Sequence, residues 1–229
     1  MLLFIQEVAE EALKEETQEK TLSIIQLIKD GGLGGQLIIA LLFVLLGVAL
    51  YIYFERFFAI KAASQVDKDF MNQIRDFVLN GKLEAAKSLC ESTKTPTSRL
   101  IGKGISRIGK PLDDINKAIE NAGKLEVYKL EKNVSVLATI AGAAPMIGFL
   151  GTVIGMIVAI HEIANSGGQI DIKMLSDGLY TAMTTTVAGL IVGIIAYIAY
   201  NHLVVRTDKV VYQMEAKSVE FLDLLNEPV

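Results

Sequence analysis

The stretch "GLYTAMTTTVAGLIVGIIAYIAYNHLVV" at residues 178–205 holds 28 consecutive residues without Asp, Glu, Lys or Arg. A helix of about 20 residues, rising 1.5 Å per residue, crosses a hydrocarbon core of roughly 30 Å. This stretch is therefore long enough to span a membrane. It also contains three consecutive threonines, Thr184 to Thr186. Hydroxyl groups in hydrocarbon need hydrogen-bond partners, so the presence of three threonines in this stretch has to be explained.

Two more charge-free runs occur, at 31–54 with 24 residues and at 133–160 with 28 residues. The whole chain of 229 residues is 52% hydrophobic and only 21% charged, with a mean hydropathy of +0.43. This composition is too apolar for an ordinary soluble domain. We therefore predict an all-α, polytopic membrane protein in which three transmembrane helices are extended by cytoplasmic helices.

The distribution of basic residues predicts the orientation of these helices. Residues 58–133 hold 14 Lys and Arg against 10 Asp and Glu, whereas residues 1–34 hold 3 against 7. Cytoplasmic segments are the ones enriched in Lys and Arg. We therefore expect the N-terminus outside the cytoplasm and the C-terminus inside it.

The predicted order of segments follows from these runs. It is an extracytoplasmic amphipathic helix at 1–32, transmembrane helices at 33–57, 133–162 and 177–205, a cytoplasmic helical region at 58–132, an extracytoplasmic loop at 163–176, and a cytoplasmic C-terminal helix at 206–229. Within the cytoplasmic region, helices are expected at 62–79 and 83–91, the latter ending near "TKTPTS" (93–98). A longer helix from Leu112 is expected to run without interruption into the second span.

The residues give no sign of a catalytic or metal centre. The single cysteine, Cys90, has no metal-ligand or redox spacing around it, and no nucleophile–base set is apparent. No basic patch interleaved with aromatic residues suggests nucleic-acid binding. We therefore expect a protein that is not an enzyme, with no catalytic residues, no metal site and no cofactor.

Small residues recur at three- and four-residue spacing in the second and third spans. Such residues let helix backbones approach closely, because lipid offers no hydrophobic incentive for helix association. The candidates for helix packing are Gly148, Gly151, Gly155, Gly189, Gly193 and Pro145. These faces could hold one subunit together, or they could also join several subunits in a ring.

Two readings of the threonines are open. A hydroxyl in a helix can bond back to the carbonyl four residues earlier, which would satisfy Thr184 to Thr186 within their own helix. Alternatively, depth indicates a shared site. Thr152 and Thr186 each lie about five residues, or roughly 8 Å, outward of the midpoints of two antiparallel spans. Their hydroxyls are therefore expected to meet at one level.

Three further polar residues cluster at the predicted outer ends of the second and third spans, and one lies near the inner end of the third. His161, Glu162 and Asp177 could form an antechamber for ions or could simply be solvated helix ends. His202 could accept a proton near an inner exit or could reach the interface as an amphipathic side chain.

Two stretches resemble a known family. "LEKNVSVLATIAGAAPMIGFLGTVIGM" (130–156) and "GLYTAMTTTVAGLIVGIIAYIAYN" (178–201) are similar to the second and third spans of ExbB/TolQ/MotA proton-channel proteins, and most similar to ExbB. The run "FERFFAIKAA" (54–63) after the first span fits as well. The order of segments also matches that family, so the resemblance covers most of the chain.

The resemblance implies a multi-pass protein of the bacterial inner membrane with a periplasmic N-terminus. It implies a homo-oligomeric ring, typically a pentamer, around single-span partners of the ExbD/TolR kind that carry an Asp in the membrane. Proton flow would then do work on a TonB-like envelope protein. The residues implied to line the proton pathway are Thr152, Thr186, Thr185 and Thr181.

The chain departs from the family pattern at one position. Many ExbB-like proteins carry Glu five residues before the threonine that matches Thr186, and Thr181 stands there in this chain. The second and third spans contain no carboxylate between Glu131 and Glu162 or between Asp177 and Asp208, so a partner would have to supply the proton carrier. The alternative hypothesis is a static oligomeric scaffold that conducts no ions.

Overall fold

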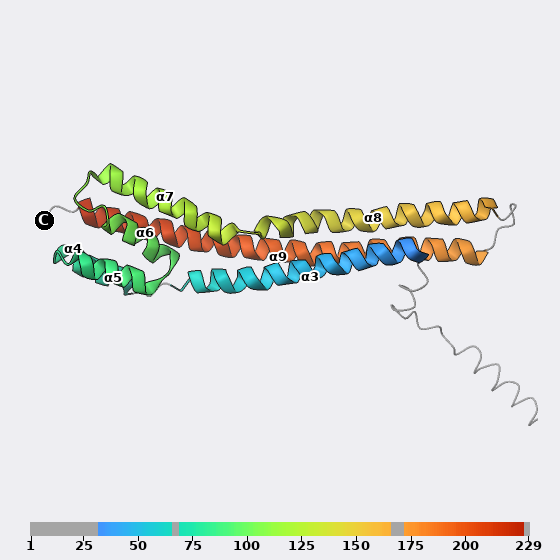
Figure 1. Ribbon diagram of the computed structural model, residues 1–229, viewed down its shortest axis with the longest axis horizontal. Helices are drawn as coiled ribbons and strands as arrows, with labels where there is room; N and C mark the ends of the chain where they lie inside the picture. The colour runs from blue at the N-terminus through green and yellow to red at the C-terminus, as the bar shows by residue number, and fades with distance from the viewer. Residues whose placement is uncertain (1–31, 66–68, 166–171, 227–229) are drawn as a thin grey trace, which may run out of the picture. The chain divides into compact units, whose positions relative to one another are not determined.

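The computed structural model describes residues 32–65, 69–165 and 172–226, and within these ranges every regular element is a helix. The helices, in chain order, are α3 (Gly32–Ala63), α4 (Phe70–Leu79), α5 (Leu83–Thr93), α6 (Pro96–Ile105), α7 (Leu112–Glu131), α8 (Val134–Asn165) and α9 (Ile172–Asn226). Figure 1 shows their succession. The predicted all-α fold is confirmed. The expected N-terminal helix at 1–32 lies almost entirely outside the described residues.

Three helical segments are long and apolar enough to cross a membrane. They are centred on α3, α8 and α9, which carry the three charge-free runs of the sequence. The chain is therefore a polytopic membrane protein. In α9 the apolar run and the C-terminal segment form one continuous helix of 55 residues, far longer than the roughly 20 residues that a bilayer requires.

The chain divides into two compact units. The first unit comprises Met1–Phe43 and Pro145–Leu190 and contains the start of α3, most of α8 and the first part of α9. Glycines and alanines face the neighbouring helices here. A Cβ atom added at Gly34 would lie 3.5 Å from Cγ2 of Ile154, which places α3 in contact with α8.

The second unit comprises Val44–Ala144 and Ile191–Val229 and contains the short helices α4 to α7. Its core includes Phe70, Ile74, Ile101 and Phe221, which are at most 2% exposed. A Cβ atom added at Gly104 would lie 2.6 Å from Cε1 of Phe221 and 2.8 Å from Cδ1 of Ile119. The bare backbone of α6 therefore fits between α7 and the C-terminal part of α9.

Three local features differ from the sequence prediction. The helix expected at 62–79 is shorter, because α3 runs on to Ala63 and α4 begins at Phe70. The helix expected to run from Leu112 into the second span is interrupted between α7 and α8, where Asn133 has a φ of 64°. Asn adopts this left-handed conformation more readily than most residues, because its side chain can hydrogen-bond locally. The helix α6, which begins within "TKTPTS", was not predicted: the Thr95 hydroxyl accepts a hydrogen bond from the amide of Ser98, and Pro96 occupies the first turn.

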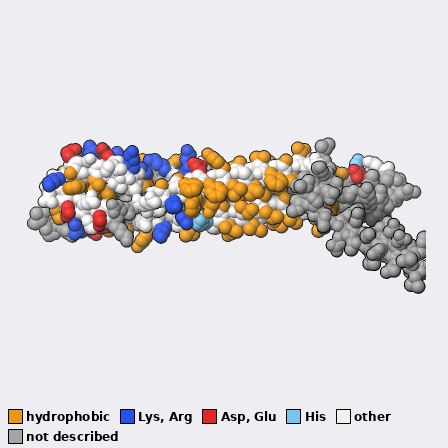
Figure 2. Space-filling view, turned by 90° about the horizontal axis from the view of Figure 1, so that it is seen from below, with side chains coloured by type: hydrophobic (Ala, Val, Ile, Leu, Met, Phe, Trp, Pro, Cys, Tyr) orange, Lys and Arg blue, Asp and Glu red, His pale blue; other side chains and the backbone are white. Residues whose placement is uncertain are grey.

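The side chains on the surface follow this division of elements. On the face shown in Figure 2, hydrophobic side chains gather over the long apolar helices, whereas Lys, Arg, Asp and Glu gather over the short helices. Exposed aliphatic and aromatic residues are abundant on α8, including Met146, Phe149 and Ile157 at 61–73% exposure. Lipid is the natural surrounding for such a surface.

Candidate ion-pathway site

The hydroxyls of Thr152 on α8 and Thr186 on α9 contact each other. Thr152 also donates to the carbonyl oxygen of Ala182 at 3.2 Å, and Thr186 donates to the carbonyl oxygen of Gly148 at 3.2 Å. Both side chains are only partly buried. The sequence prediction that these two hydroxyls meet is thus confirmed, and each hydroxyl bonds to the opposite helix.

The two hydroxyls carry two hydrogens between them, but they have three oxygen neighbours in hydrogen-bond range. When both hydrogens point at the carbonyls of Ala182 and Gly148, neither is left for the Thr–Thr contact. When one hydroxyl donates to the other, one carbonyl loses its donor. The pair can therefore reorient its hydrogens without moving either helix, which is a useful property beside an ionisable group.

The other two threonines of the triplet behave differently. Thr184 donates to the carbonyl of Tyr180 at 2.9 Å, and Thr185 donates to the carbonyls of Thr181 at 3.2 Å and Ala182 at 2.9 Å. Both residues are thus satisfied within α9, as the simpler of the two readings predicts. That reading does not extend to Thr186, because its hydroxyl bonds across to α8.

Glycines bring α8 and α9 together at this level. A Cβ atom added at Gly148 would lie 2.8 Å from the carbonyl oxygen of Thr185 and 3.1 Å from Cα of Gly189. One added at Gly151 would lie 2.7 Å from Cβ of Thr185. At Gly155 it would lie 3.1 Å from the carbonyl oxygen of Gly178. The predicted packing glycines of α8 therefore contact α9 along three successive turns.

Two more of the predicted packing residues are buried or half-buried. Gly193 is buried on α9, and Pro145 is half-buried inside α8.

Thr181 and Thr185, which the resemblance implies line the proton pathway, are both buried in the chain by itself. Thr185 is fully buried beneath Gly151, and Thr181 is only 8% exposed. A Cβ atom added at Gly35 of α3 would lie 2.6 Å from Cγ2 of Thr181. In this structure both side chains fill space between helices of the same chain. Of the four threonines that the resemblance implies, Thr152 and Thr186 are partly exposed.

The predicted antechamber at the outer helix ends is only partly described. The ring nitrogen Nε2 of His161 lies 3.0 Å from the Asn165 amide, one turn later on the same helix. Glu162 follows it on α8 and is exposed, and the side chain of Asp177 lies outside the described part of the chain. The three residues are therefore not brought together by any described contact.

A polar cluster that the sequence did not predict surrounds His202. Its Nδ1 lies 2.8 Å from the Tyr53 hydroxyl, and its Nε2 accepts a hydrogen bond from Nε of Arg206 at 2.9 Å. The Arg206 guanidinium also stacks over the ring of Phe57, 4.7 Å from its centre. The four-residue spacing of His202 and Arg206 on one helix was the available signal for this contact.

The described part of the chain contains no cluster of His, Cys, Asp or Glu that could hold a metal ion. The sequence between Glu131 and Glu162, and between Asp177 and Asp208, contains no carboxylate. The arrangement at Thr152 and Thr186 can therefore donate or accept hydrogen bonds, but it cannot itself take up a proton near neutral pH.

The profile described as the MotA/TolQ/ExbB proton channel family matches residues 92–216. The biopolymer transport protein ExbB of Helicobacter pylori is 42% identical over 79 residues, covering 34% of this chain and 54% of that protein. ExbB of Aquifex aeolicus is 36% identical over 88 residues, covering 38% of this chain and 59% of that protein.

The Tol-Pal system protein TolQ of Haemophilus influenzae is 34% identical over 94 residues, which is 41% of each chain. The matches span about half the length of these curated relatives. The family profile covers more than half of the present chain and includes both Thr152 and Thr186. This polytopic membrane protein therefore belongs to the MotA/TolQ/ExbB proton channel family.

Proposed function

We propose that the chain is an ExbB-like subunit of a proton-driven motor in a bacterial inner membrane. Several copies form a ring, most simply a pentamer, around single-span partners of the ExbD/TolR kind. A membrane Asp of the partner carries the proton, and the resulting movement does work on a TonB-like envelope protein. The observation that carries this proposal is the partly exposed hydroxyl pair of Thr152 and Thr186 in spans without carboxylates.

The chemistry of the hydroxyl pair fits this role. A carboxylate in a low-dielectric pore is costly unless hydrogen-bond donors face it. Thr152 and Thr186 can turn a hydrogen toward such a group, because each also has a carbonyl acceptor to which it can return. The pair would thus stabilise the charged partner without carrying charge itself. Thr181 and Thr185 hold the helices behind it.

Self-association is supported by apolar side chains outside the charge-free runs. Tyr128, Tyr212 and Val219 are 57–73% exposed, although they lie in the segments that we place in the cytoplasm. Lipid cannot cover residues there, and a neighbouring subunit can. The excess of Lys and Arg in 58–133 supports the cytoplasmic placement of that region and a periplasmic N-terminus.

A static scaffold is the second candidate, and the absence of the family Glu at Thr181 is the observation that favours it. The motor and the scaffold differ in whether they need the hydroxyls of Thr152 and Thr186. Replacing Thr152 and Thr186 by the isosteric Val removes both hydroxyls and nearly preserves side-chain shape. A motor then loses proton-driven work while its ring still assembles, whereas a scaffold is unaffected.

The test measures proton uptake by vesicles that contain the ring with its single-span partner, alongside the mass of the assembled complex. Thr184→Val is the matched control, because it removes a neighbouring hydroxyl that bonds only within α9. We expect proton uptake to fall at least tenfold in the Thr152→Val, Thr186→Val variant and to persist in the control. Equal uptake in wild type and the double variant would refute the motor.

A further inference from the structure

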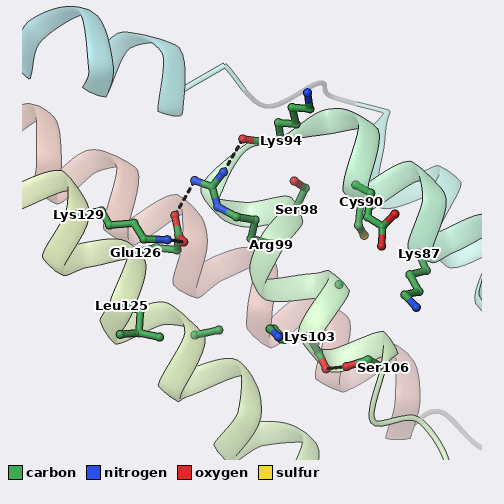
Figure 3. A pocket seen from close by; sticks show the side chains of 13 residues that line it. Lys87, Cys90, Lys94, Ser98, Arg99, Lys103, Ser106, Leu125, Glu126 and Lys129 are labelled. Carbon is green, nitrogen blue, oxygen red and sulfur yellow. Dashed lines mark hydrogen bonds and ion pairs between the residues drawn. The ribbon is translucent and has the colours of Figure 1, made fainter.

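A pocket of about 480 Å³ lies between α5, α6 and α7, within the second unit. Figure 3 shows its lining. The charged side chains that line it are Lys87, Lys94, Arg99, Lys103 and Lys129, together with Glu91 and Glu126. Five cations against two carboxylates leave an excess of three positive charges.

One carboxylate of the pocket is already neutralised. Oε2 of Glu126 accepts a hydrogen bond from Arg99 at 2.6 Å, and its Oε1 accepts one from Lys129 at 2.6 Å. Figure 3 shows these three side chains joined at one end of the pocket. Arg99 also donates to the carbonyl of Lys94 at 2.8 Å, so its guanidinium is held in place.

The other lysines are uncommitted. Among the residues that the structure describes, no carboxylate lies within ion-pair distance of Lys87, Lys94 or Lys103. The side chains of all three still line the pocket. Each ammonium group offers three hydrogen-bond donors on a flexible stem.

The rest of the lining adds no negative charge. The Ser98 and Ser106 hydroxyls donate to backbone carbonyls at 2.9 and 2.8 Å. Burial, together with the adjacent Glu91, raises the pKa of the Cys90 thiol to about 12, so the thiol is neutral. Leu125 and Ala122 supply an apolar wall. The pocket therefore combines cationic donors with apolar surface.

We propose that this pocket binds an anion bearing phosphate groups. Lysine ammonium groups bind phosphate as point charges, and a volume of 480 Å³ is typical of small-molecule sites. The phosphate could belong to a soluble molecule or to a lipid headgroup. The second source is reachable because Lys129, at one end of the pocket, accepts a hydrogen bond through its carbonyl from Arg56, two residues beyond the first apolar run.

The binding test uses the full chain in nanodiscs of phosphatidylcholine. Pyrophosphate is titrated by calorimetry at low ionic strength. In a second arm, phosphatidylglycerol replaces part of the lipid, and native mass spectrometry measures which lipid is retained. The test variant is Lys87→Gln, Lys94→Gln, Lys103→Gln. The control is Lys82→Gln, Lys110→Gln, Lys117→Gln, which removes the same charge from positions outside the pocket.

We expect at least one probe to bind, and the affinity to fall about tenfold or more in the test variant but less than about twofold in the control. A third variant with Arg at the three test positions keeps the charge and should retain binding. Binding of pyrophosphate assigns the site to a soluble ligand, and retention of phosphatidylglycerol alone assigns it to a lipid. The proposal is overturned if the wild type binds neither probe, or if both Gln variants weaken binding equally. Neither result depends on proton conduction.

Discussion

The Thr186 hydroxyl donates a hydrogen bond to the carbonyl oxygen of Gly148, 3.2 Å away on the neighbouring helix. Thr152 makes the reciprocal bond to the carbonyl of Ala182. Side-chain hydroxyls thus cross between α8 and α9 in both directions. The bonds form because glycine at position 148 leaves the backbone of α8 open to close approach by α9.

Adding a methyl group at this contact should destabilise the helix pair. In Gly151→Ala the new Cβ would lie 2.7 Å from Cβ of Thr185, well inside van der Waals contact. We expect a loss of about 1–3 kcal/mol, as for other overpacked sites. Thermal unfolding in detergent, followed by circular dichroism, measures it.

Gly142→Ala is the matched control, because a Cβ at Gly142 has no atom within 4 Å to meet. Both substitutions replace glycine in the same helix, so helix propensity cancels between them. An equal effect of the two substitutions would contradict the packing account.

The hydroxyl contact should appear as a coupling energy. In a double-mutant cycle of Thr152→Val and Thr186→Val, we expect a coupling of about 0.5–1.5 kcal/mol, typical of hydrogen bonds between membrane helices. The measurement is the unfolding free energy of the four proteins in one detergent. Strict additivity of the two substitutions would show that the hydroxyls do not interact.

Glu126 should stabilise the short-helix region in a pH-dependent way. Burial raises the pKa of this carboxyl, but hydrogen bonds and charges from Arg99 and Lys129 outweigh that effect and lower it overall. A lowered folded-state pKa gives stability that is fully present above the unfolded value of about 4.3 and is lost as pH falls through the folded value.

We therefore expect Glu126→Gln to lower the free energy of unfolding by about 1–2 kcal/mol at neutral pH. The expected loss is no larger because Arg99 and Lys129 are 46% and 63% exposed, and water screens their charges. The difference from wild type should shrink in unfolding experiments near pH 3. Glu120→Gln is the control, since Glu120 is exposed and pairs only with Lys124. A cost for Glu126→Gln that does not change with pH would refute the argument.

His202 should hold one neutral tautomer. Nε2 accepts from Arg206, so in the neutral ring the hydrogen must lie on Nδ1, facing the Tyr53 hydroxyl. Nitrogen NMR reports the tautomer directly. The chain has two histidines, so a His161→Gln background leaves one signal. We expect the Nδ1–H form, with the preference lost in Arg206→Met. An Nε2–H ring in the His161→Gln protein that still carries Arg206 would contradict the observed contact.

Charge and spacing predict much of this molecule. The three charge-free runs correspond to the three apolar helices of the structure. A run of twenty or more residues without charge suits only a membrane or a large core, so this correspondence could be predicted. Thr152 and Thr186 lie equally far from the midpoints of their spans, and both helices rise by the same distance per residue. The contact between their hydroxyls could therefore be predicted.

Other features depended on contacts that no local pattern reveals. The interruption at Asn133 arises from one left-handed residue in a segment of ordinary helix formers. Thr185 and Thr186 are neighbours in sequence, yet successive residues on a helix point about 100° apart, so Thr185 bonds within α9 whereas Thr186 bonds across to α8. The start of α6 is different, because the sequence does contain a signal for it that the prediction did not use. Thr95 followed by Pro96 is a typical helix beginning.

The most direct test of the account is proton permeation of liposomes containing the purified chain, with and without its single-span partner. The sequence contains no carboxylate between Glu131 and Glu162 or between Asp177 and Asp208, so we propose that the titrating group comes from another chain. We predict that the chain alone admits protons no faster than protein-free liposomes and that the partner raises the rate. Proton conduction by the chain alone would contradict the account.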